Sequence, residues 1–285
     1  MTLMVEGLPI EFQIVAQKFM ADLVNPETKL MPMCAVMIAR ILPFMYMSFF
    51  MGSRLIPMPV KVFMSIFLFI YMIPDMLLKA QNLSFGWHYV GYLFKEMFLG
   101  LILGTLASIP NYIVMISGMV IDYQRGASSL VTTNAILSVQ DSPVGILFSY
   151  LLVYLYWLQD IPFLYIEAVA QSYVVFPIDK FIPESVFTFD GALFKQLRDL
   201  FSLMYATGIE LAAPSLVILL MIDMFLGITN RLAPQVMISF LAQGLKAMLG
   251  LTVLYLGWYY IINIFAHCAK DWAERFHTWV MAMPF

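Results

Sequence analysis

The chain has 285 residues, of which 62% are hydrophobic and 12% charged, and its mean hydropathy is +0.87. A soluble domain is usually nearer half apolar and a quarter charged, so this composition predicts an integral membrane protein with one membrane-embedded domain over 1–285. The net charge of −3 excludes the basic surface that binding to nucleic acid requires.

Two apolar segments follow a mixed N-terminal stretch. Residues 1–30 combine acidic, basic and apolar side chains, which predicts a short amphipathic segment and does not match a cleaved signal peptide. Residues 31–51 form an apolar segment of about 20 residues, long enough to span a bilayer. A short loop joins them to the apolar residues 62–78, so a helical hairpin is expected, followed by a polar connection over 79–96.

The third apolar segment, 97–121, carries small residues at helical spacing. Gly100, Gly104 and Ser108 stand at i, i+4 and i+8, and such a stripe lets the backbone of another helix approach closely. Pro110 is expected to interrupt this helix.

The polar motif IDYQRG, residues 121–126, ends the third segment. Asp122 and Arg125 are spaced i, i+3 and are expected to pair locally. Gly126 allows a left-handed turn after them. The following residues, 127–143, are too polar for lipid and too poor in charge for a typical solvated loop.

The fourth apolar region, 144–175, is broken by a polar stretch at 159–162, so two helices in a hairpin are expected. Residues 176–203 are interpreted as a polar connection that is amphipathic in part. The tail, 265–285, is amphipathic and aromatic, which is typical of a helix lying in the membrane interface.

Residues 206–251 are the most informative stretch, because charged side chains lie inside two long apolar segments around a polar break at 229–235. The charged residues are Glu210, Asp223 and Lys246. An ionisable group at membrane depth costs about 3 kcal/mol even on a lenient insertion scale. Pro214 is expected to kink the first helix or to begin a new one, and the second helix is expected to run on to about Ile264.

Two readings of these charges remain open. The three groups either relay protons or form buried ion pairs with another helix or chain. Asp223 and Arg231 are eight residues apart, roughly 12 Å along a straight helix, so they are not expected to pair directly.

The second helix carries a polar stripe, since Gln235, Ser239, Gln243 and Lys246 fall at i, i+4, i+8 and i+11. Such a stripe does not face lipid. It faces a water-filled path, a partner subunit or another helix of the same chain.

The sequence gives no positive indication of catalysis or of a cofactor. His88, His267 and His277 have no zinc-site spacing. Cys34 and Cys268 are far apart and form no CxxC pair, so neither a disulfide framework nor a metal site is indicated.

The motifs point to a family. The run LAAPSLVILLMIDMFLGITNRLAPQVMISF, residues 211–240, resembles the signature of the T component of type III secretion export gates, the SctT family, whose flagellar relative is FliR. The run 121–127 resembles the second recognisable motif of that family, in the expected order. The matching residues in the first run are Ala213, Pro214, Asp223, Phe225, Leu226, Gly227, Arg231, Ala233, Pro234 and Gln235. The family often has Asn where this chain has Met237, so a role of that Asn does not transfer.

The resemblance implies an all-α multi-pass protein of the bacterial inner membrane, with roughly six hydrophobic segments and Pro-broken helices, and no enzymatic activity. It implies one copy of this chain in a hetero-oligomeric gate, together with about five copies of an R component, several of an S component and a U switch component. The gate would be the entry pore for unfolded secreted proteins, and the likeness is nearer to injectisome than to flagellar members. The alternative function is a proton-coupled secondary transporter that uses Glu210, Asp223 and Lys246.

The expected interface or pore residues are polar, charged or special backbone positions of the two motifs and the two helices. The polar run 128–140 is expected to lie near the pore. The candidates are Asp122, Gln124, Arg125, Gly126, Glu210, Asp223, Gly227, Arg231, Pro234, Gln235, Gln243 and Lys246.

Overall fold

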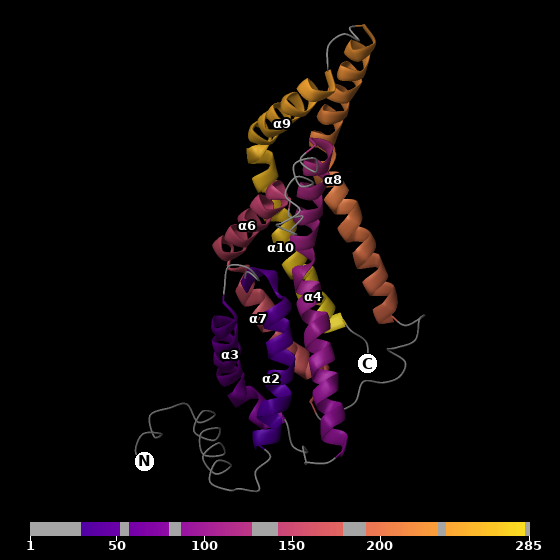
Figure 1. The fold of residues 1–285 in the computed structure, drawn as a ribbon. Helices are drawn as coiled ribbons and strands as arrows, with labels where there is room; N and C mark the ends of the chain where they lie inside the picture. Colours follow the sequence, from indigo (N-terminus) through magenta and orange to yellow (C-terminus); the bar gives the residue numbers. More distant parts are fainter. Residues whose placement is uncertain are drawn as a thin grey trace. The chain divides into compact units, whose positions relative to one another are not determined.

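The computed structural model describes residues 30–51, 57–79, 87–126, 142–178, 192–232 and 238–282 (Figure 1). Within these ranges the regular elements are eight α-helices and one 3₁₀ turn, which confirms the predicted all-α fold. In chain order they are α2 Leu30–Met47, η2 Phe49–Met51, α3 Met58–Lys79, α4 Trp87–Gln124, α6 Pro143–Leu158, α7 Ile161–Val175, α8 Ala192–Leu232, α9 Ile238–Leu256 and α10 Trp258–Ala282.

The helices belong to two compact units. Unit 1 consists of Met1–Ser108, Phe163–Phe194 and Arg275–Phe285. Unit 2 consists of Ile109–Pro162 and Lys195–Glu274. The long helices α4 and α10 each contribute one part to unit 1 and the other to unit 2.

In unit 1, α2 and α3 pack against each other, as expected for two apolar helices joined by a short loop. The α2 helix ends at Met47, and the N–H of Ser48 still donates to the carbonyl of Phe44 at 2.9 Å. The apolar parts of the two helices, Pro32–Met47 and Met58–Met72, are shorter than a usual membrane span of about 20 residues. The expected spanning length of the first segment is therefore not reached, because the chain leaves the helix at Ser48.

The α4 helix is longer than expected at its start and is not interrupted. It begins at Trp87, so residues 87–96 are helical and the predicted polar connection over 79–96 is wrong for that part. Pro110 lies inside the helix, which continues to Gln124. A proline removes one backbone hydrogen bond without having to end a helix, and the neighbours Ile109 and Ile113 are buried on either side of it.

The small-residue stripe on α4 makes a close contact with another helix, as predicted, and the structure shows that this helix is α2. A methyl group added at Gly100 would overlap the backbone carbonyl of Arg40, and one added at Gly104 would meet Met47 and the backbone of Phe44. The hydroxyl of Ser108 donates to the carbonyl of Met47. The two helix backbones can approach this closely only because these positions of α4 carry small side chains.

The predicted break in the fourth apolar region lies at Gln159-Asp160, between α6 and α7. Asp160 has a φ of 56°, a left-handed conformation that Asp adopts more readily than most residues. The α6 helix begins with a proline at its first turn, and the side chain of Ser142 accepts the N–H of Gly145 at 2.9 Å. Two helices rather than one are therefore confirmed for this region.

The α8 helix has 41 residues and passes through Pro214 without a new start. It already begins at Ala192, so part of the predicted connection over 176–203 is helical. The next helix ends earlier than expected, because α9 stops at Leu256, Gly257 forms a turn, and α10 follows at an angle of 62°. The expectation of one helix to Ile264 is therefore wrong, and glycine, a poor helix former, stands at the break.

The amphipathic character of α10 serves packing within the protein. In unit 2 the ring of Phe265 packs edge-on against Phe148, with 5.2 Å between centroids. In unit 1 the ring of Phe276 lies 4.8 Å from that of Tyr165. Part of the apolar face of this helix is therefore buried against other helices of the chain.

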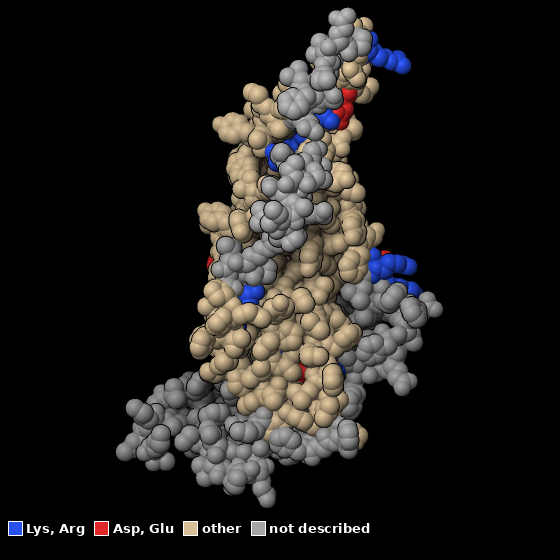
Figure 2. All heavy atoms as spheres, viewed as in Figure 1, with Lys and Arg blue, Asp and Glu red and all other residues tan. Residues whose placement is uncertain are grey.

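Two described helices are long and apolar enough to cross a membrane, namely the parts His88–Gln124 of α4 and Arg198–Leu232 of α8. The number of candidate membrane spans rises to four if the bent pair α6 and α7 counts as one span and the bent pair α9 and α10 as another. The apolar window of α4 is 61% buried, but that of α8 is only 22% buried. On the face shown in Figure 2, the described surface carries few charged side chains.

Candidate functional site

Five of the predicted site residues take part in polar contacts in unit 2 and are together called the motif cluster: Asp122, Gln124, Arg125, Asp223 and Lys246. Asp122 and Arg125, at the end of α4, form the predicted local ion pair at 2.6 Å. Gly126 follows with a φ of 85°, so the predicted left-handed turn is also confirmed.

Asp122 additionally anchors the start of α6. Its carboxylate accepts the backbone N–H of Val144 at 2.9 Å and the hydroxyl of Ser142. A carboxylate at a helix N-terminus is stabilised by the free N–H groups and by the helix dipole. Asp122 is buried, and it ties the end of α4 to the start of α6 through the same side chain that pairs with Arg125.

Asp223 of α8 is held from two sides. It forms an ion pair with Lys246 of α9, and one of its oxygens accepts from Nε2 of Gln124 at 3.5 Å. The side chains of Lys246 and Asp223 are 20% and 34% exposed, so the pair is partly shielded from solvent. Of the two readings left open by the sequence, this geometry corresponds to an ion pair between two helices of the same chain.

The other candidates do not join the motif cluster. Gly227 and Arg231 are exposed on α8, and a methyl group added at Gly227 would meet no atom within 4 Å. Glu210 is exposed and lines a cavity with Pro214. Pro234, Gln235 and the run 128–140 lie outside the described residues, and Gln243 is on α9 with its side chain outside them.

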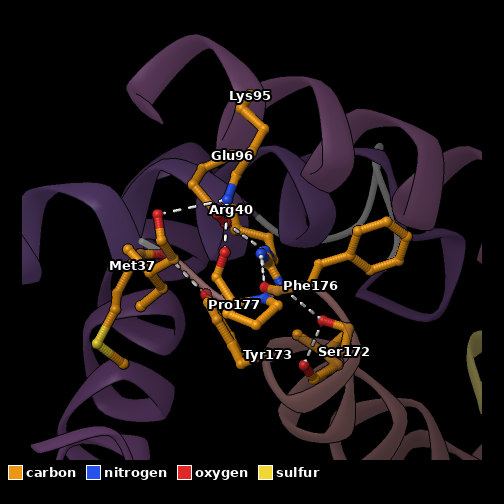
Figure 3. Close-up of polar contacts among 10 residues, drawn as sticks. Met37, Arg40, Lys95, Glu96, Ser172, Tyr173, Phe176 and Pro177 are labelled. Atoms are coloured by element: carbon orange, nitrogen blue, oxygen red, sulfur yellow. Dashed lines mark hydrogen bonds and ion pairs between the residues drawn. The ribbon is translucent and has the colours of Figure 1, made fainter. Parts of the chain in front are cut away.

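A second polar cluster lies in unit 1, here called the Arg40 cluster, and sequence reasoning did not identify it (Figure 3). Arg40 of α2 and Glu96 of α4 are both fully buried and form an ion pair through Nε of the arginine. Nη1 of Arg40 donates to the hydroxyl of Ser172 at 3.0 Å, and Nη2 donates to the carbonyl of Phe176 at 2.8 Å. The guanidinium also lies over the ring of Tyr173, 4.0 Å from its centroid.

Lys95 extends this cluster to the residues that follow α7. Its Nζ lies 2.8 Å from Oε1 of Glu96 and donates to the carbonyl of Pro177 at 2.7 Å. The hydroxyl of Tyr173 donates to the carbonyl of Met37 at 3.0 Å. The Arg40 cluster therefore binds α2, α4 and the end of α7 together through charge-assisted contacts, which are stronger than neutral hydrogen bonds.

One signal in the sequence pointed to this cluster. Arg40 stands inside an apolar segment, where a buried guanidinium needs an acidic partner. Glu96 was assigned to a polar connection, and that assignment hid the pairing between the two residues.

The contacts of both clusters join helices to one another. Among the residues that the structure describes, no three His, Cys, Asp or Glu side chains are close enough to hold a metal ion.

The Asp223–Lys246 pair gives a first prediction. Replacing Lys246 by Met is expected to lower stability by about 1 kcal/mol, because partly exposed ion pairs contribute modestly. The charge swap Asp223→Lys with Lys246→Asp is expected to recover part of this loss. Denaturant unfolding in detergent micelles measures both, with Arg231→Met at an exposed position as control. A charge swap that is less stable than Asp223→Lys alone and less stable than Lys246→Asp alone would contradict the pairing.

Comparison with known proteins places the chain among export proteins. The family described as Bacterial export proteins, family 1, matches residues 31–271. The chain is 28% identical over 176 residues to Yop proteins translocation protein T of Yersinia pestis, which is 62% of this chain and 65% of that protein. It is 24% identical over 183 residues to secretion system apparatus protein SsaT of Salmonella typhimurium, covering 64% of this chain and 69% of the relative.

A flagellar protein is similar to the same degree. The chain is 27% identical over 188 residues to flagellar biosynthetic protein FliR of Caulobacter vibrioides, covering 65% of this chain and 69% of the relative. The matched part spans 65% of the length of the Yersinia protein.

Proposed function

Because the chain belongs to family 1 of the bacterial export proteins, we propose that it is a structural subunit of a type III protein export apparatus. The observation that carries this proposal is the family match over residues 31–271. The geometry supports it, since the two motifs that resemble the SctT family meet in one cluster. Gln124 of the first motif donates to Asp223 of the second at 3.5 Å, so the motifs maintain one local architecture.

In this proposal the chain is present once in an export gate of the bacterial inner membrane. It packs with about five copies of an R component, several of an S component and a U switch component. The assembly forms the entry pore for unfolded secreted proteins. The proposal that the gate serves an injectisome rather than a flagellum rests on the sequence resemblance.

The surface of α8 supports a role in assembly. Its apolar window is only 22% buried within the chain, so its apolar side chains need lipid or partner subunits as cover. The exposed apolar side chains on this helix include Ile209, Val217, Met221, Met224, Phe225 and Ile228. The proton-coupled transporter, by contrast, gains no support from the motif cluster, where Asp223 and Lys246 neutralise each other.

Purification of the tagged full chain from inner membranes tests the proposed function. Other components of the export apparatus are expected to co-purify in fixed ratio. Arg231→Glu is expected to reduce their recovery several-fold, because Arg231 is exposed at the end of α8 and the charge reversal alters a contact surface. Arg198→Glu, at an exposed position near the start of α8, serves as the control.

Two results would contradict the proposal. One is a homogeneous monomer or homodimer that moves a small solute across proteoliposomes. The other is recovery of the chain from membranes without any export component, under conditions where the components are all expressed.

A further inference from the structure

A cavity of about 280 Å³ lies within unit 2, and its lining includes Ile121 and Pro214 of the two motif runs but no residue of the motif cluster. Residues of α4, α6, α8, α9 and α10 line it, and all of them belong to unit 2. Its buried lining is mainly apolar and includes Ile121, Phe148 and Phe265. Its exposed lining, here called the outer lining, includes Glu210 and Tyr260.

A buried polar atom in the lining favours a water molecule in the cavity. Ser117 is 1% exposed and lines the cavity, and its hydroxyl has no hydrogen-bond partner. A buried hydroxyl without a partner costs free energy. A water molecule that reaches Ser117 recovers this cost, and the apolar body of an occupant does not.

The outer lining carries the groups that recognise a cation. The carboxylate of Glu210 forms no ion pair with the described basic side chains, and Tyr260 contributes an aromatic ring. A carboxylate and an aromatic ring together favour a positively charged, hydrogen-bond-donating group.

We propose that this cavity binds an organic ammonium compound, with an apolar body against Phe148 and Phe265 and the ammonium group at Glu210 and Tyr260. The volume accommodates roughly nine non-hydrogen atoms, at the ~30 Å³ that one water molecule occupies in the liquid. This size corresponds to an amine with a short alkyl chain. A carboxylate-headed amphiphile of equal size is excluded by repulsion from Glu210. The inference rests on the cavity alone and does not depend on the export function.

Binding of n-octylammonium to the full chain in lipid nanodiscs tests the proposal. A diazirine derivative of octylamine, activated by light, labels the residues it contacts, and mass spectrometry locates the labels. Saturable labelling is expected on the helices that line the cavity, and unlabelled octylammonium is expected to compete. Octanol and octanoate, which partition into lipid without a positive charge, are expected to compete at least tenfold less well.

Two variants and a matched control sharpen the test. Glu210→Gln removes the charge and is expected to raise the half-saturating concentration at least tenfold. Leu211→Trp places a larger side chain in the cavity lining and is expected to abolish labelling. Glu167→Gln changes an exposed carboxylate outside the cavity lining and is expected to leave labelling unchanged.

The proposal is overturned if Glu210→Gln saturates at the wild-type concentration, or if octanol competes as well as octylammonium. If Leu211→Trp does not fold, Glu210→Gln alone tests the proposal. Position 210 is exposed, so this variant is expected to fold. Co-purification of export components is measured with the same variants, so that a failure of amine binding is distinguished from a failure of the export function.

Discussion

Replacing Arg40 by Met is expected to destabilise the chain by about 3–5 kcal/mol, the usual cost of removing one partner from a buried ion pair. Glu96, which is fully buried, would lose the guanidinium that neutralises it. Ser172 and the carbonyl of Phe176 would lose their donors in the same step. Lys95 remains near Glu96 at 2.8 Å, so part of the charge stays compensated and the loss is expected toward the lower end of the range.

Denaturant unfolding in mixed micelles measures this effect. The single variant Glu96→Gln is expected to destabilise the chain at least as much as Arg40→Met, because the buried cations Arg40 and Lys95 both lose the carboxylate that neutralises them. Arg198→Met is the matched control. Its ion pair with Asp199 is 71% exposed on both sides, and exposed pairs contribute about 1 kcal/mol or less. Equal losses for Arg40→Met and Arg198→Met would contradict the structure of the Arg40 cluster.

Replacing Gly100 by Ala is expected to force α4 away from α2. The added methyl group would overlap the carbonyl of Arg40, which is a backbone atom and cannot rotate away. Overpacking of this kind costs about 1–3 kcal/mol, and separating the helices also weakens the contacts of Arg40 with Glu96. The expected loss of stability is informative, because replacing Gly by Ala inside a helix otherwise raises stability by about 1 kcal/mol.

Gly227→Ala is the control, and it is not expected to lower stability. It lies inside α8, where an added methyl group meets no atom within 4 Å. Its stability in the same micelles should equal or slightly exceed that of the wild-type chain. A Gly100→Ala variant that is as stable as Gly227→Ala would show that α2 and α4 do not pack as closely as described.

The stripe of small residues and the local pairing of Asp122 with Arg125 were the parts of the structure that sequence reasoning predicted well. Gly100 and Gly104 are at a spacing that allows another helix to approach closely, and they face α2. Asp122 and Arg125 are near enough in sequence to pair on one helix turn, and they do. Local spacing determines both features, so no knowledge of the tertiary fold was needed.

The features that sequence reasoning missed depend on contacts between distant segments. The Arg40–Glu96 pair joins residues 56 positions apart, and no local rule connects them. Pro110 and Pro214 lie inside continuous helices because buried packing on neighbouring turns outweighs the single lost hydrogen bond. In the same way, the partner of Asp223 on α9 becomes evident only when the chain is folded.

The most direct test of the proposed export-gate function is a photo-crosslinking amino acid at Met224, an exposed position on the apolar surface of α8. In cells that express the complete export apparatus, we expect crosslinked products that contain other components of the apparatus. The same amino acid at Phe265, which is 1% exposed, should give only products within the chain. Crosslinks from Met224 to lipid alone, in cells where the apparatus is assembled, would contradict the proposal that partner subunits cover this helix.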